Sequence, residues 1–139
     1  MVATILMVAS AAILFALGAL HLIYTFFGPK LTPRDPALQS SMREISPVIT
    51  KETTMWRCWI GFNATHSMAA MLFGLIYGFL AISHSNLLFA SSYLLVVGLL
   101  MVGGFVALSK AYFFSIPFIG TGISLVCYAA SVIVALTCH

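Results

Sequence analysis

Charged residues are what this 139-residue sequence has least of: six Lys or Arg and three Asp or Glu make up only 6% of the chain. Water-soluble proteins usually carry about a quarter charged residues. Because 62% of the residues are hydrophobic, too little polar surface remains to cover a globule in water, and lipid is the expected solvent. The length favours a single domain that spans residues 1–139.

Several signatures of catalysis and nucleic-acid binding are absent as well. The sequence has no GxSxG and no HExxH motif. All three acidic residues lie between residues 35 and 52, so no apolar segment contains a carboxylate base. No basic stripe with interleaved aromatic residues indicates nucleic-acid binding. Within the apolar segments we expect imidazole and amide side chains at only one level, and one such level does not make an ion pathway. We therefore expect no enzyme, no channel and no nucleic-acid-binding protein.

The three cysteines do not form a disulfide framework. Cys127 and Cys138 fall on one predicted helix, about 16 Å apart by helical rise. A disulfide needs Cα atoms within about 7 Å. Cys58 is expected at the other end of the molecule. The sequence therefore predicts no disulfide within the chain.

Four apolar segments are long enough to cross the hydrocarbon core of a bilayer, which is about 30 Å thick. They cover about residues 2–27, 55–82, 87–108 and 118–138. The first has no preceding Lys or Arg and continues past the small residues 9–12, so we expect a retained span and no cleaved signal peptide. Helices satisfy their own backbone groups in lipid. The sequence predicts an all-α, integral membrane, antiparallel four-helix bundle.

The positions of the cations predict the orientation. The connection between the first two spans, taken through Arg57, holds five of the six Lys and Arg residues, and Lys110 lies in the third connection. Cations concentrate on the cytoplasmic side of membrane proteins. We therefore expect a multi-pass protein of the bacterial cytoplasmic (inner) membrane, with both termini in the periplasm.

The first connection predicts a short amphipathic cytoplasmic helix. Asp35 can cap a helix whose first residue is Pro36. Apolar residues follow at helical spacing: Leu38, Met42, Ile45 and Ile49. Such a helix would lie at the membrane surface. Ser46–Pro47 offers a second cap-and-proline start, so we expect the helix of the second span to begin there, in the cytosol, several turns before it enters lipid.

Polar residues interrupt the apolar character of the second span. Trp59, Asn63, His66 and Tyr77 recur at helical spacing on one face, and Ser67 borders that face. Polar side chains are costly in lipid, so they should point into the bundle and find partners there.

The first span carries a similar polar stripe, Gly18, His21 and Thr25. His21 lies about 9 Å from the end of its span, and His66 lies about 10 Å past Trp59 on the second span, which runs the other way. We expect the two imidazoles to meet at one level. Arg57 should extend toward the phosphate layer near the interface.

This polar layer has two interpretations. It can fix the packing of the helices by hydrogen bonds between them, or it can bind a small molecule. The candidate binding residues are His21, Thr25, Arg57, Asn63, His66, Ser67 and Tyr77. Haem would be cramped between histidines on neighbouring helices, and two histidines without an acidic or thiolate companion make a weak metal site. A quinone or a lipid head group requires less.

The last two predicted spans look like packing helices. Small residues recur at helical spacing on the fourth: Gly120, Ser124, Cys127, Ser131 and Ala135. Gly103–Gly104 in the third span permits close packing or a kink. Small residues let helix backbones approach one another closely in lipid.

Two motifs in the middle of the chain support a resemblance. "LTPRDPALQSSM" and "TKETTMWRCWIGFNATHSMAAMLFGL" resemble a family of small bacterial membrane proteins with a TPRDPAL-like loop and a TTMWRxWxGFNxSH-like second span. The likeness covers roughly the middle third of the chain and the histidine late in the first span. The matching residues are Thr32, Pro33, Arg34, Asp35, Pro36, Met55, Trp56, Arg57, Gly61, Phe62, Asn63, His66 and Ser67. The resemblance implies a four-span inner-membrane protein and supplies no activity.

Two functions remain open. The first is a non-catalytic accessory or interaction subunit of a larger membrane complex or of a homo-oligomer. The second is a protein that binds haem, quinone or lipid through the layer of His21, Asn63 and His66. In either case the lipid bilayer is a partner.

Overall fold

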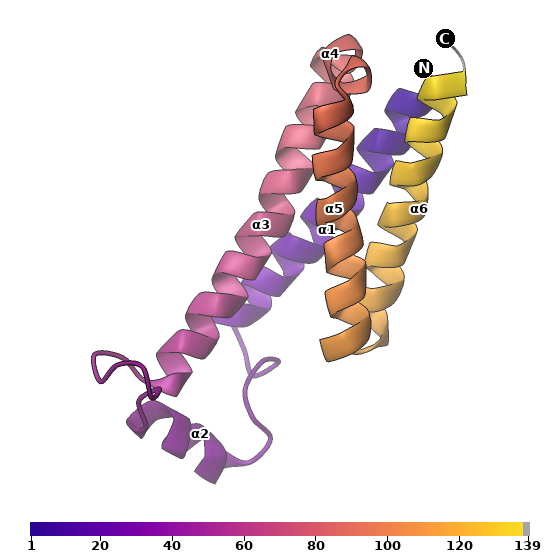
Figure 1. The fold of residues 1–139 in the computed structure, drawn as a ribbon. Helices are drawn as coiled ribbons and strands as arrows, with labels where there is room; N and C mark the ends of the chain where they lie inside the picture. The colour runs from indigo at the N-terminus through magenta and orange to yellow at the C-terminus, as the bar shows by residue number, and fades with distance from the viewer. Residues whose placement is uncertain (138–139) are drawn as a thin grey trace. The chain divides into compact units, whose positions relative to one another are not determined.

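The computed structural model describes residues 1–137, and this part of the chain consists of helices joined by short connections (Figure 1). In chain order the helices are α1 (Val2–Phe26), α2 (Pro36–Glu44), α3 (Met55–Ser83), α4 (Ser85–Ala90), α5 (Ser92–Tyr112) and α6 (Ser115–Thr137). α1, α3, α5 and α6 are long and apolar enough to cross a membrane. The prediction of an all-helical protein with four helices of membrane-spanning length is confirmed. Cys138, with which the predicted fourth span ends, lies outside the described residues.

The chain divides into two compact units: Met1–Leu17 with Ala70–His139, and Gly18–Ala69. The first contains the beginning of α1, the end of α3, and α4 to α6. The second contains the end of α1, the first connection, α2 and the beginning of α3. Each unit is held together by its own packing contacts and hydrogen bonds.

In the first unit, small residues bring α6 against α1. The Ser124 hydroxyl donates to the Ser10 carbonyl at a distance of 3.0 Å, and the Ser131 hydroxyl donates to the Ala3 carbonyl at a distance of 2.6 Å. A Cβ atom added at Gly120 would lie 2.9 Å from a methyl group of Leu17. These hydrogen bonds and close contacts need small residues, so the predicted stripe on α6 is a packing face.

An aromatic cluster around Gly98 joins α3, α5 and α6 in the same unit. The rings of Phe73 and Tyr77 stack with centroids 4.4 Å apart, and Tyr128 meets Tyr77 edge to face at 6.1 Å. The Tyr77 hydroxyl donates to the Leu94 carbonyl at 2.7 Å, and the Tyr128 hydroxyl donates to the Leu95 carbonyl at 2.8 Å. Both tyrosines are buried, and their polar ends are satisfied by backbone carbonyls.

The third predicted span is wrong in its start and its end. The sequence predicts one helix over residues 87–108, whereas the chain breaks at Ser91 between α4 and α5, and α5 continues to Tyr112. The Ser91 backbone is extended, and its hydroxyl accepts a hydrogen bond from the Leu94 amide, so it caps α5. Hydropathy could not reveal the break because apolar residues flank it on both sides.

The second unit is organised by its turns. Gly28 ends α1 with a φ of 84°, a left-handed conformation that glycine adopts without strain. The Thr32 amide then donates to the Pro29 carbonyl, which turns the chain. Asp35 caps α2 by accepting from the Ala37 amide, as predicted, and Pro36 opens the helix.

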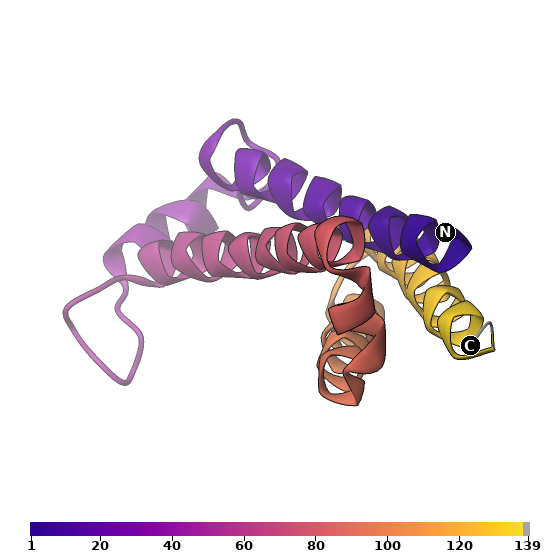
Figure 2. The same cartoon turned by 90° about the horizontal axis from the view of Figure 1, so that it is seen from above.

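The predicted early start of α3 at Ser46–Pro47 is wrong, because residues 45–54 form a loop without helix (Figure 2). The Met55 amide donates to the Ile45 carbonyl at 2.8 Å and closes the base of this loop. The Thr54 hydroxyl accepts from the Arg57 amide and marks the true start of α3. The closed loop keeps the end of α2 beside the beginning of α3.

Candidate functional site

The predicted polar layer exists within the second unit. His21 Nε2 lies 2.9 Å from Asn63 Oδ1, and the rings of His21 and His66 meet edge to face with centroids 5.4 Å apart. The prediction that the two imidazoles meet at one level is confirmed. The prediction counts the helical rise from each membrane interface to His21 and to His66. The count is valid because α1 and α3 are uninterrupted through these residues.

The hydrogen-bond partners of Asn63 determine the tautomer of His21. The Asn63 amide nitrogen donates to the Trp59 carbonyl at 2.7 Å. The amide oxygen therefore faces His21, and His21 donates from Nε2. In the neutral ring, Nδ1 is then the acceptor. The layer is a directed set of hydrogen bonds that joins α1 to α3.

Three more side chains reinforce this layer. The Ser67 hydroxyl donates to the Asn63 carbonyl and is fully buried. The Thr25 hydroxyl donates to the His21 carbonyl one turn along α1. The Trp59 indole donates to the Leu31 carbonyl at 2.9 Å, which ties the connection after α1 to α3. These hydrogen bonds thus hold the end of α1, the connection that follows it and the beginning of α3 in one arrangement.

The contact between the two imidazoles bears on haem binding. Rings with centroids 5.4 Å apart in an edge-to-face arrangement are in direct contact. An iron ligated by both histidines would need the porphyrin plane between them. The observed arrangement leaves no slot for that plane, and Nε2 of His21 is already engaged by Asn63.

Two of the predicted binding residues have surroundings of their own. Arg57 is exposed in the first turn of α3. Tyr77 belongs to the first compact unit, where its hydroxyl group bonds to the Leu94 carbonyl. The binding roles proposed for these two residues stay predictions.

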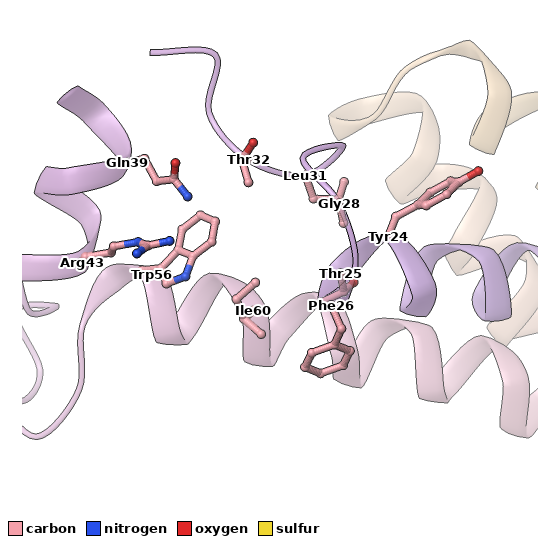
Figure 3. Close-up of a pocket in the computed structure, with 10 residues that line it drawn as sticks. All are labelled: Tyr24, Thr25, Phe26, Gly28, Leu31, Thr32, Gln39, Arg43, Trp56 and Ile60. Atoms are coloured by element: carbon pink, nitrogen blue, oxygen red, sulfur yellow. The ribbon is translucent and has the colours of Figure 1, made fainter. Parts of the chain in front are cut away.

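A pocket of about 310 Å³ lies within the second unit (Figure 3). Its lining comes from the end of α1, the following connection, α2 and the first turns of α3. The lining residues are Tyr24, Thr25, Phe26, Gly28, Leu31, Thr32, Gln39, Arg43, Trp56 and Ile60. The volume is at the lower end of the range for small-molecule sites, which suits a head group or a ring.

The pocket is continuous in the chain with the polar layer. Thr25 follows His21 by four residues on α1, and Ile60 precedes Asn63 by three residues on α3. Both spacings correspond to about one helical turn, roughly 5.4 Å. Because Leu31 also lines the pocket and is held by Trp59, the hydrogen-bonded layer supports two walls of the pocket.

The polar wall of the pocket comes from α2. Gln39 and Arg43 are four residues apart, so they share one face of this helix. The Arg43 guanidinium carbon lies 5.5 Å from the centroid of the Trp56 ring, within the range of a cation–π contact. Figure 3 shows the Gln39 and Arg43 side chains directed toward Trp56. The Ile45–Met55 hydrogen bond makes this contact possible.

Sequence reasoning missed most of these lining residues. Of the seven predicted binding residues, only Thr25 lines the pocket. Gln39 and Arg43 lie on the predicted surface helix at a spacing of four, and that spacing was the signal that could have identified them. What the sequence lacks is the direction in which α2 folds, which depends on the backbone at Gly28 and the loop closure at Met55.

Metal binding is not supported in the part of the chain that the structure describes. Within residues 1–137 no group of three or more His, Cys, Asp or Glu side chains could hold a metal ion. Among the described residues, Cys58 and Cys127 are free thiols. Two imidazoles alone make an incomplete zinc or copper site.

Comparisons with known proteins do not assign the chain to a family. No family model, no curated protein and no solved structure matches the chain. The resemblance to a family with TPRDPAL-like and TTMWRxWxGFNxSH-like motifs therefore stays a prediction, and the function rests on the geometry of the second unit.

Proposed function

We propose that this chain is a non-catalytic membrane protein that binds an amphipathic membrane molecule, such as a lipid or a quinone, in the pocket of its second unit. The pocket itself is the observation that carries the proposal. One wall offers Arg43 and Gln39, and other parts of the lining offer Phe26, Leu31 and Ile60. Such a pairing of polar and apolar surfaces suits a molecule with a polar head and an apolar body.

The proposal includes the membrane orientation. We propose an antiparallel four-helix bundle in the bacterial cytoplasmic membrane, with both termini in the periplasm. The six cations, all in the first and third connections or in residues that flank them, support this orientation. α2 would then lie along the cytoplasmic surface, and the pocket would open where head groups and acyl chains meet.

A pocket-filling substitution tests the binding function. The full chain, purified in a mild detergent, should retain a lipophilic molecule at fixed stoichiometry, which mass spectrometry of the organic extract measures. Gln39→Trp places an indole in the pocket and should reduce the retained amount by about tenfold, a loss of about 1.4 kcal/mol of binding free energy.

Ser40→Trp is the matched control. Ser40 is the next residue on α2, is exposed and does not line the pocket. This variant should retain the molecule like the wild type. Equal retention by all three proteins, or no retained molecule in the wild type, would show that the pocket is not a binding site.

An accessory-subunit function is the second candidate, and one observation favours it. A Cβ atom added at Gly103 or Gly104 of α5 would meet no atom within 4 Å. Flat, small-residue surfaces of this kind let another membrane helix approach closely. Copurification with one protein at constant stoichiometry, lost in Gly103→Leu, would support this candidate. A monodisperse protein without any partner would count against it.

A further inference from the structure

The chemistry of the pocket identifies the class of polar head that it can bind. Arg43 is the one charged residue among the ten that line it, and none of these ten described residues is acidic. The nearest acidic residue in sequence, Glu44, lies 3.4 Å from the Ser40 hydroxyl through its carboxylate. Asp35 is occupied by the cap of α2. The charge of Arg43 therefore faces the pocket without a carboxylate in the lining to neutralise it.

The polar side chains of the lining differ in whether they can donate a hydrogen bond to a ligand. The Thr25 hydroxyl donates to the His21 carbonyl, and the Thr32 hydroxyl donates to the Pro29 carbonyl. Neither hydroxyl proton is then available to a ligand. The side-chain donors that remain in the lining are the Arg43 guanidinium and the Gln39 amide group, which share one face of α2, together with the Trp56 indole N–H and the Tyr24 hydroxyl.

A second cation lies beside another lining residue. Lys30 Nζ is 3.9 Å from the centroid of the Tyr24 ring, as Arg43 lies over Trp56. Both cations are held on aromatic rings, which leaves their N–H groups available for hydrogen bonds with an anion. Guanidinium groups bind phosphate through two parallel hydrogen bonds.

We propose that the pocket binds a phosphate group, that of an anionic phospholipid, through Arg43 and Gln39. The inference rests on the proposed binding function and names its ligand class. Phe26, Leu31 and Ile60 would contact the glycerol and the first acyl carbons, which selects a lipid over free phosphate. Basic pockets near the cytoplasmic ends of membrane helices bind lipid head groups in this way.

The test is a titration of the delipidated full chain with phosphatidylglycerol in detergent, followed by native mass spectrometry. Arg43→Gln should weaken binding by about tenfold or more, as expected for the loss of a charge-assisted hydrogen bond. The affinity of Arg43→Lys should lie between those of the wild type and of Arg43→Gln, because lysine keeps the charge without the two parallel donors. Gln39→Leu should weaken binding by less than Arg43→Gln.

Arg34→Gln is the matched control. It removes the same charge from a residue that is exposed, as Arg43 is, but that does not line the pocket. This variant should bind within about twofold of the wild type, because exposed charges act weakly at a distance in salt. An equal loss in both variants would mean that general surface charge attracts the lipid, and would overturn the inference.

Two further probes distinguish the alternatives. Excess inorganic phosphate that displaces the lipid would support the phosphate chemistry but assign it to a soluble source as well; lipid binding unchanged by phosphate would support the lipid alone. A glycosyl diacylglycerol with the same acyl chains should bind at least about tenfold more weakly. If it binds equally well and Gln39→Trp abolishes the binding of both lipids, the phosphate inference falls while the proposed function stands.

Discussion

Replacing Gly98 with alanine should cause a large loss of stability. A Cβ atom at this position would meet the Tyr128 hydroxyl and lie 2.6 Å from a ring carbon of Tyr77. Overpacking usually costs about 1–3 kcal/mol. The displaced rings would also lose their hydrogen bonds to the Leu94 and Leu95 carbonyls, about 1 kcal/mol each. We expect a total of about 3 kcal/mol or more.

Denaturant titration of the detergent-solubilised protein, followed by circular dichroism, measures this effect. Gly103→Ala on the same helix is the control, because a Cβ atom there meets nothing within 4 Å. That variant should be as stable as the wild type or slightly more stable, since alanine has a higher helix propensity than glycine. Identical unfolding curves for the two variants would contradict the observed packing of Gly98 against Tyr77 and Tyr128.

Replacing Asn63 with leucine should have the second largest effect. The change keeps the approximate size but removes the acceptor of the His21 Nε2–H group and the donor to the Trp59 carbonyl. A half-buried donor left without its acceptor costs about 1–3 kcal/mol. Hydrogen bonds between membrane helices average only about 0.6 kcal/mol, with a maximum of about 1.7. We therefore expect a loss of about 1–2 kcal/mol.

A double-mutant cycle with His21→Leu isolates this hydrogen bond. Because the two residues share one bond, the double variant should lose less stability than the sum of the single variants. Thr65→Val is the control on the same helix: Thr65 is exposed, and its hydroxyl bonds the Phe62 carbonyl of its own helix. Strict additivity in the cycle, with Thr65→Val as destabilising as Asn63→Leu, would contradict a specific His21–Asn63 interaction.

The Asn63 variant also links stability to binding. The layer that Asn63 completes supports Thr25 and, through Trp59, Leu31, and both of these residues line the pocket. Asn63→Leu should therefore retain less of the bound molecule even where the protein remains folded. Retention at the wild-type level would mean that the layer and the pocket are independent.

The helices could be predicted because hydropathy and the cost of unsatisfied backbone groups in lipid dictate them. The break at Ser91 could not, because Leu88 and Leu94 are equally apolar on either side of it. The span over residues 55–82 could be predicted, but the loop that precedes Met55 could not. Ser46–Pro47 is a valid helix start, and the hydrogen bond between Ile45 and Met55 overrides it. Local signals identify helix starts but not the loop closures that compete with them.

The candidate site divides in the same way. His21, Asn63 and His66 could be assigned to one layer from the sequence, since polar side chains in lipid point inward and find partners. The specific hydrogen bond between His21 and Asn63 could not be predicted. Arg43 and Gln39 could not be assigned to the pocket. Their position depends on the left-handed backbone of Gly28 and on the hydrogen bond between Met55 and Ile45, which together set the direction of α2. Turn geometry of that kind is not encoded in hydrophobic periodicity.

Photo-crosslinking tests the central claim most directly, because it locates the bound molecule on the chain. A phosphatidylglycerol with a photoreactive group near its phosphate would be reconstituted with the full protein, irradiated and mapped by peptide mass spectrometry. Crosslinks are predicted on Gln39, Trp56 and their neighbours, and they should disappear in Gln39→Trp. Crosslinks spread over the exposed faces of α5 and α6, and unchanged in that variant, would contradict a lipid pocket between α1, α2 and α3.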